Sequence, residues 1–290
     1  MIKSAYRILI ENIPAKLSLI VQYIRHHHIF PNIKTPRSFN EKILARKLSN
    51  QYLELFVRLA DKVAVKEYVK DILGESLIIP TLWSGSSPPP FEVLEKIQSK
   101  FVVKSNHASG WNYFSQNDGG FDYKEISNLC NQWLNTEWHP ELGEWWYNKI
   151  EREIIVEPFI NEIDTSLTDY KVFVFGGRAE FIQVDTDRFT THKRDYYDLN
   201  WNLLPFRVEH DNANIRTPRP KFLKEILSGA ELLAKPFDFC RVDFYELADG
   251  PKFGEMTFAP GAGHERFFPK QYDFEIGTKW NILSRESSAR

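Results

Sequence analysis

The chain has 290 residues, of which 42% are hydrophobic and 14% aromatic, and its 37 basic and 39 acidic side chains leave a formal net charge of -2. This composition excludes a mainly disordered chain, because disorder goes with few aromatic residues and a high net charge. No apolar run approaches the roughly 18 residues of a membrane span, and the balanced charge gives no general attraction to nucleic acid. Cys130 and Cys240 make neither a disulfide framework nor a zinc cluster, so we expect a reducing cytoplasm, with one bridge between them as the open alternative.

The first 38 residues form an N-terminal helical segment, with apolar side chains at helical intervals between residues 2 and 30. Glu11, Pro14 and Lys16 interrupt the apolar stretch and no small-residue cleavage site follows, so we expect no secretory signal. One or two helices packed on the body are the simpler interpretation. Several basic residues and the histidine run 26–28 leave a helix on a membrane surface as the alternative.

The region after this segment predicts helices, a linker and a short strand. Ser38 followed by Glu41 has the pattern of a capping box, so a helical segment should begin there and continue to about residue 70. The run Ser-Gly-Ser-Ser-Pro-Pro-Pro at 84–90 predicts a linker, because it suits neither a helix nor a central strand. Beyond the linker, the pattern predicts a strand at 101–104 and a tryptophan-rich helix at 122–146.

From Arg152 onward strand patterns dominate, with hairpin chemistry at Gly176-Gly177 and one helix at 220–234. The predicted strands are 154–160, 171–175, 180–184, 239–247 and 252–258. Helices and mainly antiparallel strands in blocks, without regular βαβ alternation, predict an α+β fold. We expect a first lobe at 39–150 and a second at 151–290. The core of the second lobe should contain Val156, Val172, Val174, Phe181, Val242, Phe244 and Met256.

The last two predicted strands carry the strongest functional signal. If residues 248–250 form a three-residue hairpin loop, the register pairs Asp243 with Glu255 and Arg241 with Thr257 on one face. Opposed carboxylates destabilise a sheet, since two such charges at about 4 Å repel by about 4 kcal/mol at an effective dielectric of about 20. A cation between them would remove this cost, and oxygen ligands suit Mg²⁺, which completes its shell with waters and phosphates. A solvated charged face with another register is the alternative.

Two upstream segments are typical of a nucleotide site. Lys104 ends a strand, and the small residues at 105–110, which include Ser109 and Gly110, allow backbone N–H groups to approach an anion. An ordinary turn is the competing interpretation of this loop. Glu157 and Pro158 break the apolar strand at 154–160, either as a simple strand end or as a hinge that binds adenine.

Several other residues each have two possible roles. The charged, hydroxyl-rich stretch 185–194 is either a solvated loop or a lid, in which Arg188 and Arg194 would bind a phosphate or a carboxylate. Lys171 is either a phosphate contact or one half of a cross-strand ion pair. Core packing and stacking on sugar rings are the two interpretations for Trp133, Trp138, Trp145 and Trp146.

The order of these segments resembles the ATP-grasp family. The matching residues are Leu59-Ala60-Asp61-Lys62 with Lys66, Phe101-Val102-Val103-Lys104, Ile155-Val156-Glu157, Arg241-Val242-Asp243 and Gly254-Glu255-Met256-Thr257. The resemblance is closer to the TupA-like branch, which is associated with teichuronopeptide and capsular polysaccharide synthesis. That likeness spans about residues 39–274 and rests on Ser38-Phe39-Asn40-Glu41-Lys42, Asp169-Tyr170-Lys171, Asp185-Thr186-Asp187-Arg188-Phe189 and Pro260-Gly261-Ala262-Gly263.

The resemblance implies two α+β lobes that hold ATP with Mg²⁺ and activate a carboxylate as an acyl phosphate for attack by an amine. On this basis the residues expected to contact the nucleotide are Lys62, Lys104, Ser109, Gly110, Glu157, Pro158, Phe159 and Ile160. Those expected to hold the metal are Asp243, Glu255 and Thr257, although Thr257 stands where many members have asparagine and is a weaker ligand. Arg241 matches a position that stabilises the tetrahedral intermediate in peptide-forming ligases, and we expect Lys171 and Arg188 to assist catalysis.

These inferences predict an ATP-dependent ligase that amidates a uronic-acid carboxylate with an amino acid or amine in bacterial surface-polysaccharide synthesis, releasing ADP and phosphate. We expect it in the cytoplasm, with peripheral contact to the membrane or to capsule-assembly enzymes. One alternative is a glycosyltransferase that uses Asp243 and Glu255 around a nucleotide-sugar metal. The other is a non-catalytic nucleotide-binding assembly protein, which the departure at Thr257 favours.

Overall fold

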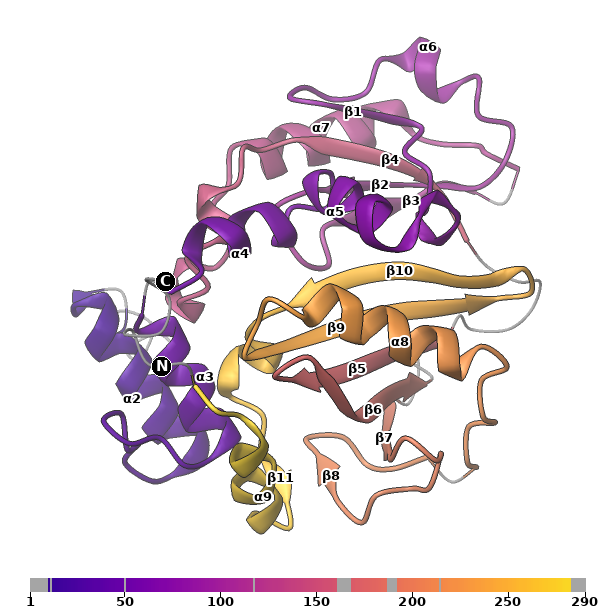
Figure 1. Cartoon of the computed structure of the whole chain (residues 1–290). Helices are drawn as coiled ribbons and strands as arrows, with labels where there is room; N and C mark the ends of the chain where they lie inside the picture. The colour runs from indigo at the N-terminus through magenta and orange to yellow at the C-terminus, as the bar shows by residue number, and fades with distance from the viewer. Residues whose placement is uncertain are drawn as a thin grey trace.

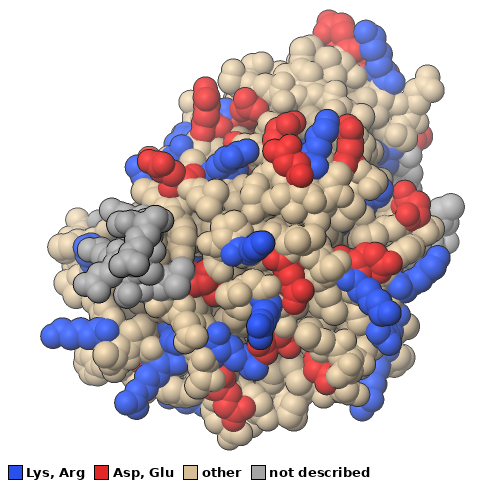
Figure 2. All heavy atoms as spheres, in the orientation of Figure 1, with Lys and Arg blue, Asp and Glu red and all other residues tan. Residues whose placement is uncertain are grey.

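Two β-sheets and a group of helices make up the computed structural model, which describes residues 10, 12–49, 51–116, 118–160, 168–186, 192–213 and 215–282. Figure 1 shows the first sheet in the upper part of the view, the second sheet below it, and helices α2 and α3 to the left. On the face drawn in Figure 2, basic and acidic side chains are interspersed. Within the described ranges no helix is both long enough and apolar enough to cross a membrane.

Three helices replace the single helical segment predicted up to residue 70. They are α3 (Phe39–Lys47), α4 (Leu53–Ala60) and α5 (Ala64–Leu73), and α2 (Ala15–His27) precedes them. The capping box is confirmed, since Ser38 Oγ accepts from the Glu41 N–H at 3.2 Å and Glu41 Oε2 accepts from the Ser38 N–H at 3.1 Å. The helical path breaks at Tyr52, whose φ of 60° is left-handed, and at Asp61, which is extended. Apolar periodicity does not reveal such local breaks, so the helical segment predicted up to about residue 70 consists of three separate helices.

The first sheet has the strand order β1-β4-β2-β3 and is antiparallel. Its strands are β1 (Trp83–Gly85), β2 (Phe101–Ser105), β3 (Asn112–Phe114) and β4 (Ile154–Pro158). Helices α6 (Phe91–Leu94) and α7 (Tyr123–Leu134) pack in the same lobe, and η1 (Glu75–Leu77) precedes β1. Two short 3-10 helices, η2 (Pro140–Leu142) and η3 (Tyr147–Lys149), follow α7, where the sequence predicted one helix at 122–146.

Strand β4 corrects the predicted boundary between the lobes. It lies between β1 and β2, and Val156 pairs with Trp83 on one side and with Val103 on the other. Val156 is therefore in the core of the first lobe, not of the second as predicted. The first sheet extends to Pro158, beyond the boundary expected at residue 150. The apolar pattern identifies β4 as a buried strand, but it carries no signal for the sheet that the strand joins.

The second sheet has the order β10-β9-β5-β6-β7 and is antiparallel, as the sequence predicts. Its strands are β5 (Asp169–Phe175), β6 (Arg178–Thr186), β7 (Lys193–Tyr197), β9 (Phe239–Leu247) and β10 (Gly250–Thr257). Helix α8 (Leu223–Ala234) packs on one face, where its Gly229 approaches the Phe244 ring. Because side chains alternate along a strand, Arg241, Asp243 and Tyr245 of β9 project from the opposite face.

The hairpin between β9 and β10 has a shorter loop than predicted. Gly250 pairs with Leu247, so residues 248–249 form a two-residue loop instead of the three-residue loop expected at 248–250. This pairing continues to Phe253, which lies opposite Phe244. Had the register continued unchanged, Asp243 would lie opposite Gly254 and not opposite Glu255.

A β-bulge at Gly254 restores the predicted register of the functional residues. Beyond it, Glu255 pairs with Asp243 and Thr257 pairs with Arg241, as predicted. The backbone is tight here, because a Cβ on Gly254 would lie 3.1 Å from the Asp243 carbonyl oxygen. The two side-chain pairs are therefore confirmed, while the predicted loop was wrong by one residue.

Helix α3 is anchored to the second sheet, although its residues were expected in the first lobe. Phe39 packs against the rings of Phe173, Phe175 and Phe239, with centroid separations from 5.1 to 6.1 Å. Arg46 donates to the carbonyl oxygens of Phe239 at 3.0 Å and of Phe258 at 2.9 Å. The remaining elements are β8 (Arg207–Val208), η4 (Pro260–Gly263), β11 (Phe267–Phe268), which pairs with β8, and α9 (Gln271–Lys279).

Candidate active site

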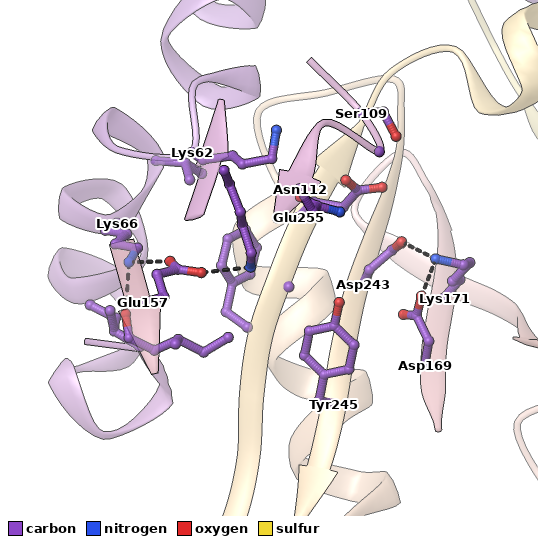
Figure 3. A pocket seen from close by; sticks show the side chains of 17 residues that line it. Lys62, Lys66, Ser109, Asn112, Glu157, Asp169, Lys171, Asp243, Tyr245 and Glu255 are labelled. Atoms are coloured by element: carbon purple, nitrogen blue, oxygen red, sulfur yellow. Dashed lines mark hydrogen bonds and ion pairs between the residues drawn. The ribbon is translucent and has the colours of Figure 1, made fainter. Parts of the chain in front are cut away.

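A pocket of about 280 Å³ lies between the two sheets, and Figure 3 shows side chains from both lobes around it. The first lobe contributes Lys62, Lys66, Lys104 and Glu157, together with Ser109 and Gly110 of the loop after β2. The second lobe contributes Asp169, Lys171, Asp243, Tyr245 and Glu255. Three lysines and one carboxylate thus lie on one wall, and three carboxylates and one lysine lie on the other.

Glu157 organises two of the lysines on the first wall. Its Oε1 accepts from Lys66 Nζ at 2.5 Å and its Oε2 from Lys104 Nζ at 2.6 Å. Burial favours the neutral form of Glu157, but the two ammonium groups outweigh burial and lower its pKa below the usual value. Lys66 also donates to Ile79 O at 2.8 Å and Thr81 Oγ1 at 2.7 Å, so its three donors are used. Among the described residues Lys104 donates only to Glu157, which leaves donors for a ligand.

Lys62 projects beside the small-residue loop that follows β2. Its ammonium group donates to the carbonyl oxygen of Ala108, and burial lowers its pKa to about 8. The base of the loop is fixed, because the Asn106 amide donates to Asp61 Oδ1 at 3.0 Å and to Glu151 O at 2.9 Å. Its tip, Ser109 and Gly110, is exposed at the pocket. A ligand in the pocket would meet both the tip and the lysine.

Arg241 compensates the opposed carboxylates on the second wall. Its Nε donates to Asp243 Oδ1 at 2.7 Å, and its Nη2 donates to Asp243 Oδ2 at 2.7 Å, Glu255 Oε1 at 2.8 Å and Thr257 Oγ1 at 2.9 Å. Burial raises the pKa of Asp243 to about 6. For Glu255, burial is outweighed by Arg241, Lys171 and Lys62, and its pKa falls to about 2. The guanidinium therefore contacts an oxygen of each of the three predicted metal ligands.

Lys171 lies between two aspartates on the same face of the sheet. Its Nζ is 2.5 Å from both Asp169 Oδ2 and Asp243 Oδ2. The cross-strand ion pair, one of the two interpretations of Lys171, is what the structure contains, because Lys171 and Asp243 are direct partners of β5 and β9. The same side chain lines the pocket.

The structure brings most of the predicted site residues together and leaves a few apart. Around the pocket lie Lys62, Lys104, Ser109, Gly110, Glu157, Lys171, Asp243 and Glu255, and Arg241 and Thr257 contact this group. Pro158, Phe159 and Ile160 are not among the lining residues. The Phe159 N–H donates to Lys100 O at 2.9 Å, and its ring packs on Phe114. Arg188 lies outside the described residues.

Comparison with known proteins gives the family of this chain. A family model described as TupA-like ATP-grasp matches residues 41–281. The chain belongs to the TupA-like ATP-grasp family. The α+β fold with two lobes, expected from the sequence, is confirmed. No curated protein matches the sequence of this TupA-like chain.

Solved structures similar to this TupA-like chain are ATP-grasp proteins of low sequence identity. D-alanine–D-alanine ligase from Bacillus anthracis, complexed with ATP, is 16% identical, with a TM-score of 0.42 and coverage of 77% of this chain and 66% of that one. The ATP-grasp ligase PsnB with a minimal precursor is 9% identical, with a TM-score of 0.41 and coverage of 71% and 54%. A RimK domain ATP-grasp protein from Sphaerobacter thermophilus is 14% identical, with a TM-score of 0.43 and coverage of 80% and 70%. The chain thus spans 54% to 70% of the length of these proteins.

The second wall has the donor chemistry that Mg²⁺ prefers. Asp243 and Glu255 supply carboxylate oxygens and Thr257 a hydroxyl, all within reach of one Arg241 nitrogen. In the part of the chain that the structure describes, no three His, Cys, Asp or Glu side chains gather as a complete metal site. Two carboxylates fit magnesium that takes its remaining ligands from waters and from phosphate oxygens, and they do not fit a fully protein-bound structural metal.

Nine lining residues of this TupA-like site were not predicted as site residues, and three of them carry a charged group or a phenol. Asp169 and Tyr245 line the pocket, and Lys66 was noted only for its match to the family. Asp169 lies two residues before Lys171, so period-two alternation along a predicted strand places both on one face and could have identified it. Tyr245 follows the same rule from Asp243. The partners of Lys66 come from separate segments of the chain, and no local pattern reveals them.

Proposed function

We propose that this chain is an ATP-dependent carboxylate–amine ligase that releases ADP and phosphate. The observation that carries the proposal is the pair of opposed walls, with Lys62 and Lys104 on one and Asp243 and Glu255 on the other. Such a pocket suits a triphosphate, because the lysines would balance its negative charge and the carboxylates would hold a magnesium ion that neutralises more of it. Membership of the TupA-like ATP-grasp family supports the same activity.

The proposed reaction has two steps. A carboxylate oxygen of the first substrate attacks the γ-phosphorus of ATP, and ADP leaves. The amine nitrogen then attacks the acyl carbon, the C–N bond forms, and phosphate leaves with the electrons of the C–O bond. Bound magnesium would neutralise part of the negative charge of the phosphates.

Each wall has its own part in these steps. Lys62 and Lys104 orient the nucleotide, and Asp243, Glu255 and Thr257 would hold the metal. Arg241 stabilises the oxyanion on the acyl carbon, an interaction worth about 2.7–4 kcal/mol in comparable sites. Lys171 neutralises Asp243, and Arg188 is proposed to close over the γ-phosphate.

We place the adenine at the end of the pocket near Glu157. Val65, Ile78, Ile79 and Phe253 supply apolar surface among the lining residues. This surface suits a flat base, because ligand pockets combine apolar walls with a few polar groups that fix orientation. Of the predicted hinge, Glu157 lines the pocket and would lie beside adenine and ribose.

We further propose that the carboxylate belongs to a uronic acid and that the amine is an amino acid or a related compound. The product would enter a bacterial capsule or another surface polysaccharide. The support is the association of the TupA-like branch with such polymers. Synthesis would take place in the cytoplasm, with peripheral contact to the inner face of the membrane.

The decisive experiment measures nucleotide products across pairs of carboxylates and amines. We expect ADP and phosphate to form only when a carboxylate and an amine are both present with Mg²⁺. Formation of AMP and pyrophosphate would contradict the proposed mechanism. A panel of ATP, ADP and UDP-sugars in a thermal-shift assay tests the alternatives, because a glycosyltransferase would be stabilised by a UDP-sugar with Mg²⁺ and not by ATP.

A charge-neutralising variant of the metal pair gives a second test. Glu255→Gln removes one negative charge with little change of shape, and we expect nearly complete loss of ADP formation. The fold should persist, because the Glu255 side chain is 42% exposed. Asp249→Asn, at the exposed tip of the same hairpin, is the matched control and should keep its activity. Activity of Glu255→Gln within a few-fold of the parent would remove Glu255 from the metal site.

A further inference from the structure

We infer that the outer side of α2, together with the loop that joins it to α3, binds a bilayer surface with anionic headgroups. The inference rests on the proposed function only for the contact with a membrane and needs no ligase activity, so each can fail without the other. This surface, the α2 face, has an apolar part in Leu17, Ile20, Val21, Ile24, Phe30 and Ile33 and a basic part in Lys16, Arg25, Lys34 and Arg37.

Polar contacts fix which side of α2 meets the rest of the protein. Gln22 Nε2 donates to Glu141 O at 2.7 Å and to Ser18 Oγ at 3.2 Å. Near the end of the helix, His27 Nε2 donates to Gly263 O at 2.8 Å. The buried residues of the helix are Ser18, Leu19, Gln22 and Tyr23. Figure 1 shows α2 at the left of the view, outside α3, so the opposite side of α2 faces away from the body of the protein.

The outward side of α2 carries a second apolar stripe. Four apolar side chains follow the spacing i, i+3, i+4 and i+7, which forms one stripe along a helix: Leu17, Ile20, Val21 and Ile24. Leu17 is 47% exposed, the other three are partly exposed, and none of the four belongs to a hydrophobic cluster of the described residues. A surface helix normally turns its polar side to water, whereas α2 buries the polar Ser18 and Gln22. The outward stripe therefore suits an apolar environment outside the protein.

The loop after α2 continues the apolar part of the surface. Phe30 is 83% exposed and Ile33 is 37% exposed. The loop is braced, because the backbone N–H groups of Asn32 and Arg37 donate to the two oxygens of Glu41 at 2.9 and 2.8 Å. A large aromatic side chain is thus held in water on a fixed loop. Phenylalanine and leucine on the apolar side are typical of helices that lie in the membrane interface.

The charge of the α2 face is complementary to anionic headgroups. Between Glu11 and Glu41 the sequence has no acidic residue, although the whole chain has a formal net charge of -2. The same stretch has four exposed basic residues, which are Lys16, Arg25, Lys34 and Arg37. Figure 2 shows basic side chains projecting at the lower left edge of the molecule, where α2 and its loop lie. Each lysine or arginine near an anionic surface raises the affinity about fivefold.

The same charge argues against a second copy of this chain as the partner. In a symmetric dimer the same surface patch of both copies meets at the interface. Two α2 faces in contact would bring eight basic residues together with no acidic residue from either stretch between them. Anionic lipid supplies both the negative charge and the apolar layer that the α2 face lacks.

Sedimentation of the full chain with vesicles tests the inference. One set of vesicles is phosphatidylcholine alone, and the other is an equal mixture of phosphatidylcholine and phosphatidylglycerol. We expect binding to the mixture and at least about tenfold weaker binding to phosphatidylcholine alone. Raising the salt from about 0.15 M to about 1 M shortens the Debye length from about 8 Å to about 3 Å and should weaken the binding.

Matched variants locate the bound surface. Phe30→Ser should lower the affinity for the mixed vesicles about tenfold, whereas Ile215→Ser, which alters a side chain that is 84% exposed in the second lobe, should not change it. On the helix, Leu17→Gln should lower the affinity about 3–10-fold, and Leu232→Gln, on α8 with 49% exposure, is its control.

Charge variants give an independent arm of the same test. Lys34→Gln combined with Arg37→Gln should lower the affinity about fivefold for each charge removed. Arg216→Gln combined with Arg219→Gln removes two exposed charges away from α2 and should behave as the parent. Every variant should melt near the parent temperature, because the altered side chains are exposed, and should release ADP at the parent rate in solution.

Three results would overturn the α2 face. One is the absence of binding to the mixed vesicles, or equal binding to both kinds of vesicle. Another is an equal loss in the variants and in their controls, which would assign the binding to unspecific surface contacts. The last is a dimer in light scattering that Leu17→Gln and Phe30→Ser dissociate, because a second copy would then cover this surface. If ADP release fails with every substrate pair, the proposed ligase function falls, and vesicle binding still decides the α2 face.

Discussion

At the scale of single residues, the guanidinium of Arg241 occupies the centre of the second wall. One of its nitrogens reaches Asp243, Glu255 and Thr257 together. The guanidinium supplies positive charge that the opposed carboxylates need, with Lys171 on the other side of Asp243. Arg241 can therefore both maintain the site before the ligand binds and stabilise charge during the reaction.

Replacement of Arg241 by methionine should separate these two roles. We expect kcat to fall by roughly 10²–10³-fold, by analogy with the loss of an oxyanion donor, with a much smaller rise of the KM for ATP. The variant should also have a lower Tm, because buried Asp243 loses its main partner. Steady-state kinetics across a magnesium titration check the assignment. Full recovery of kcat by added magnesium would show that Arg241 serves only as a counter-charge.

As the proposed nucleotide contact, Lys62 should make ATP binding sensitive to alkaline pH. Burial disfavours its ammonium form and lowers its pKa to about 8, so the side chain loses its charge as the pH rises through this value. A neutral amine cannot balance a phosphate, and the affinity for ATP should fall above about pH 8. In Lys62→Arg this loss should be absent, because arginine stays protonated. Calorimetric titration of ATP at fixed magnesium would measure the dependence, and an equal decline in both proteins would point to another group.

At the scale of elements, the β9–β10 hairpin shows what the sequence can and cannot predict. Alternation of side chains placed Asp243, Glu255, Arg241 and Thr257 on one face, and these pairs are confirmed. The loop length was wrong, because a two-residue loop followed by a bulge gives the same distal register as a three-residue loop without one. Sequence patterns do not distinguish the two solutions unless the glycine at position 254 is taken as the sign of a bulge.

The sheet that β4 joins was not predicted, although the strand itself was, because its partners are distant in the chain. The sheet that β4 joins depends on β1 and β2, and even the nearest pairing of β4 with β2, between Ile154 and Ser105, spans 49 residues (154 minus 105). Capping chemistry is local, and the start of α3 at Ser38 was predicted correctly. The pocket residues divide in the same way. The carboxylates on β9 and β10 were predictable, because they lie on one strand pair. The lysine pair around Glu157 was not, because it joins α5, β2 and β4.

The bulge offers a test of the hairpin as a metal-positioning element. In Gly254→Val the new Cβ would lie 3.1 Å from the Asp243 carbonyl oxygen and 3.3 Å from the Tyr245 ring, so the Asp243 backbone or the ring must move by a few tenths of an ångström. We expect a Tm lower by a few degrees and a weaker dependence of ATP binding on magnesium, because Glu255 moves relative to Asp243. Asp249→Asn again serves as the control on the same hairpin. Unchanged magnesium dependence in a folded Gly254→Val protein would show that the register beyond the bulge does not need glycine.

At the scale of the whole molecule, the candidate site exists only where the two lobes meet. The lysine wall belongs to the first lobe and the carboxylate wall to the second, with the pocket between them. A nucleotide that contacts both walls must join the lobes, and its negative phosphates face Asp243 and Glu255 unless a divalent cation intervenes. The increase in the free energy of unfolding when the nucleotide binds should therefore depend on magnesium more strongly than it would at a site built from one lobe.

Thermal unfolding with and without magnesium tests this coupling. At 100 times its Kd, a ligand that binds only the folded state adds about 2.7 kcal/mol, which corresponds to roughly 5–10 °C in Tm for a chain of this size. We expect a shift of this order for ATP with Mg²⁺ and a much smaller one for the same concentration of ATP with a chelator, because the phosphates are then repelled by the second wall. Lys104→Met should reduce the shift with Mg²⁺, since it removes a charge from the first wall. Equal shifts with magnesium and with chelator would mean that the nucleotide binds to the first lobe alone and that the carboxylate pair takes no part in holding it.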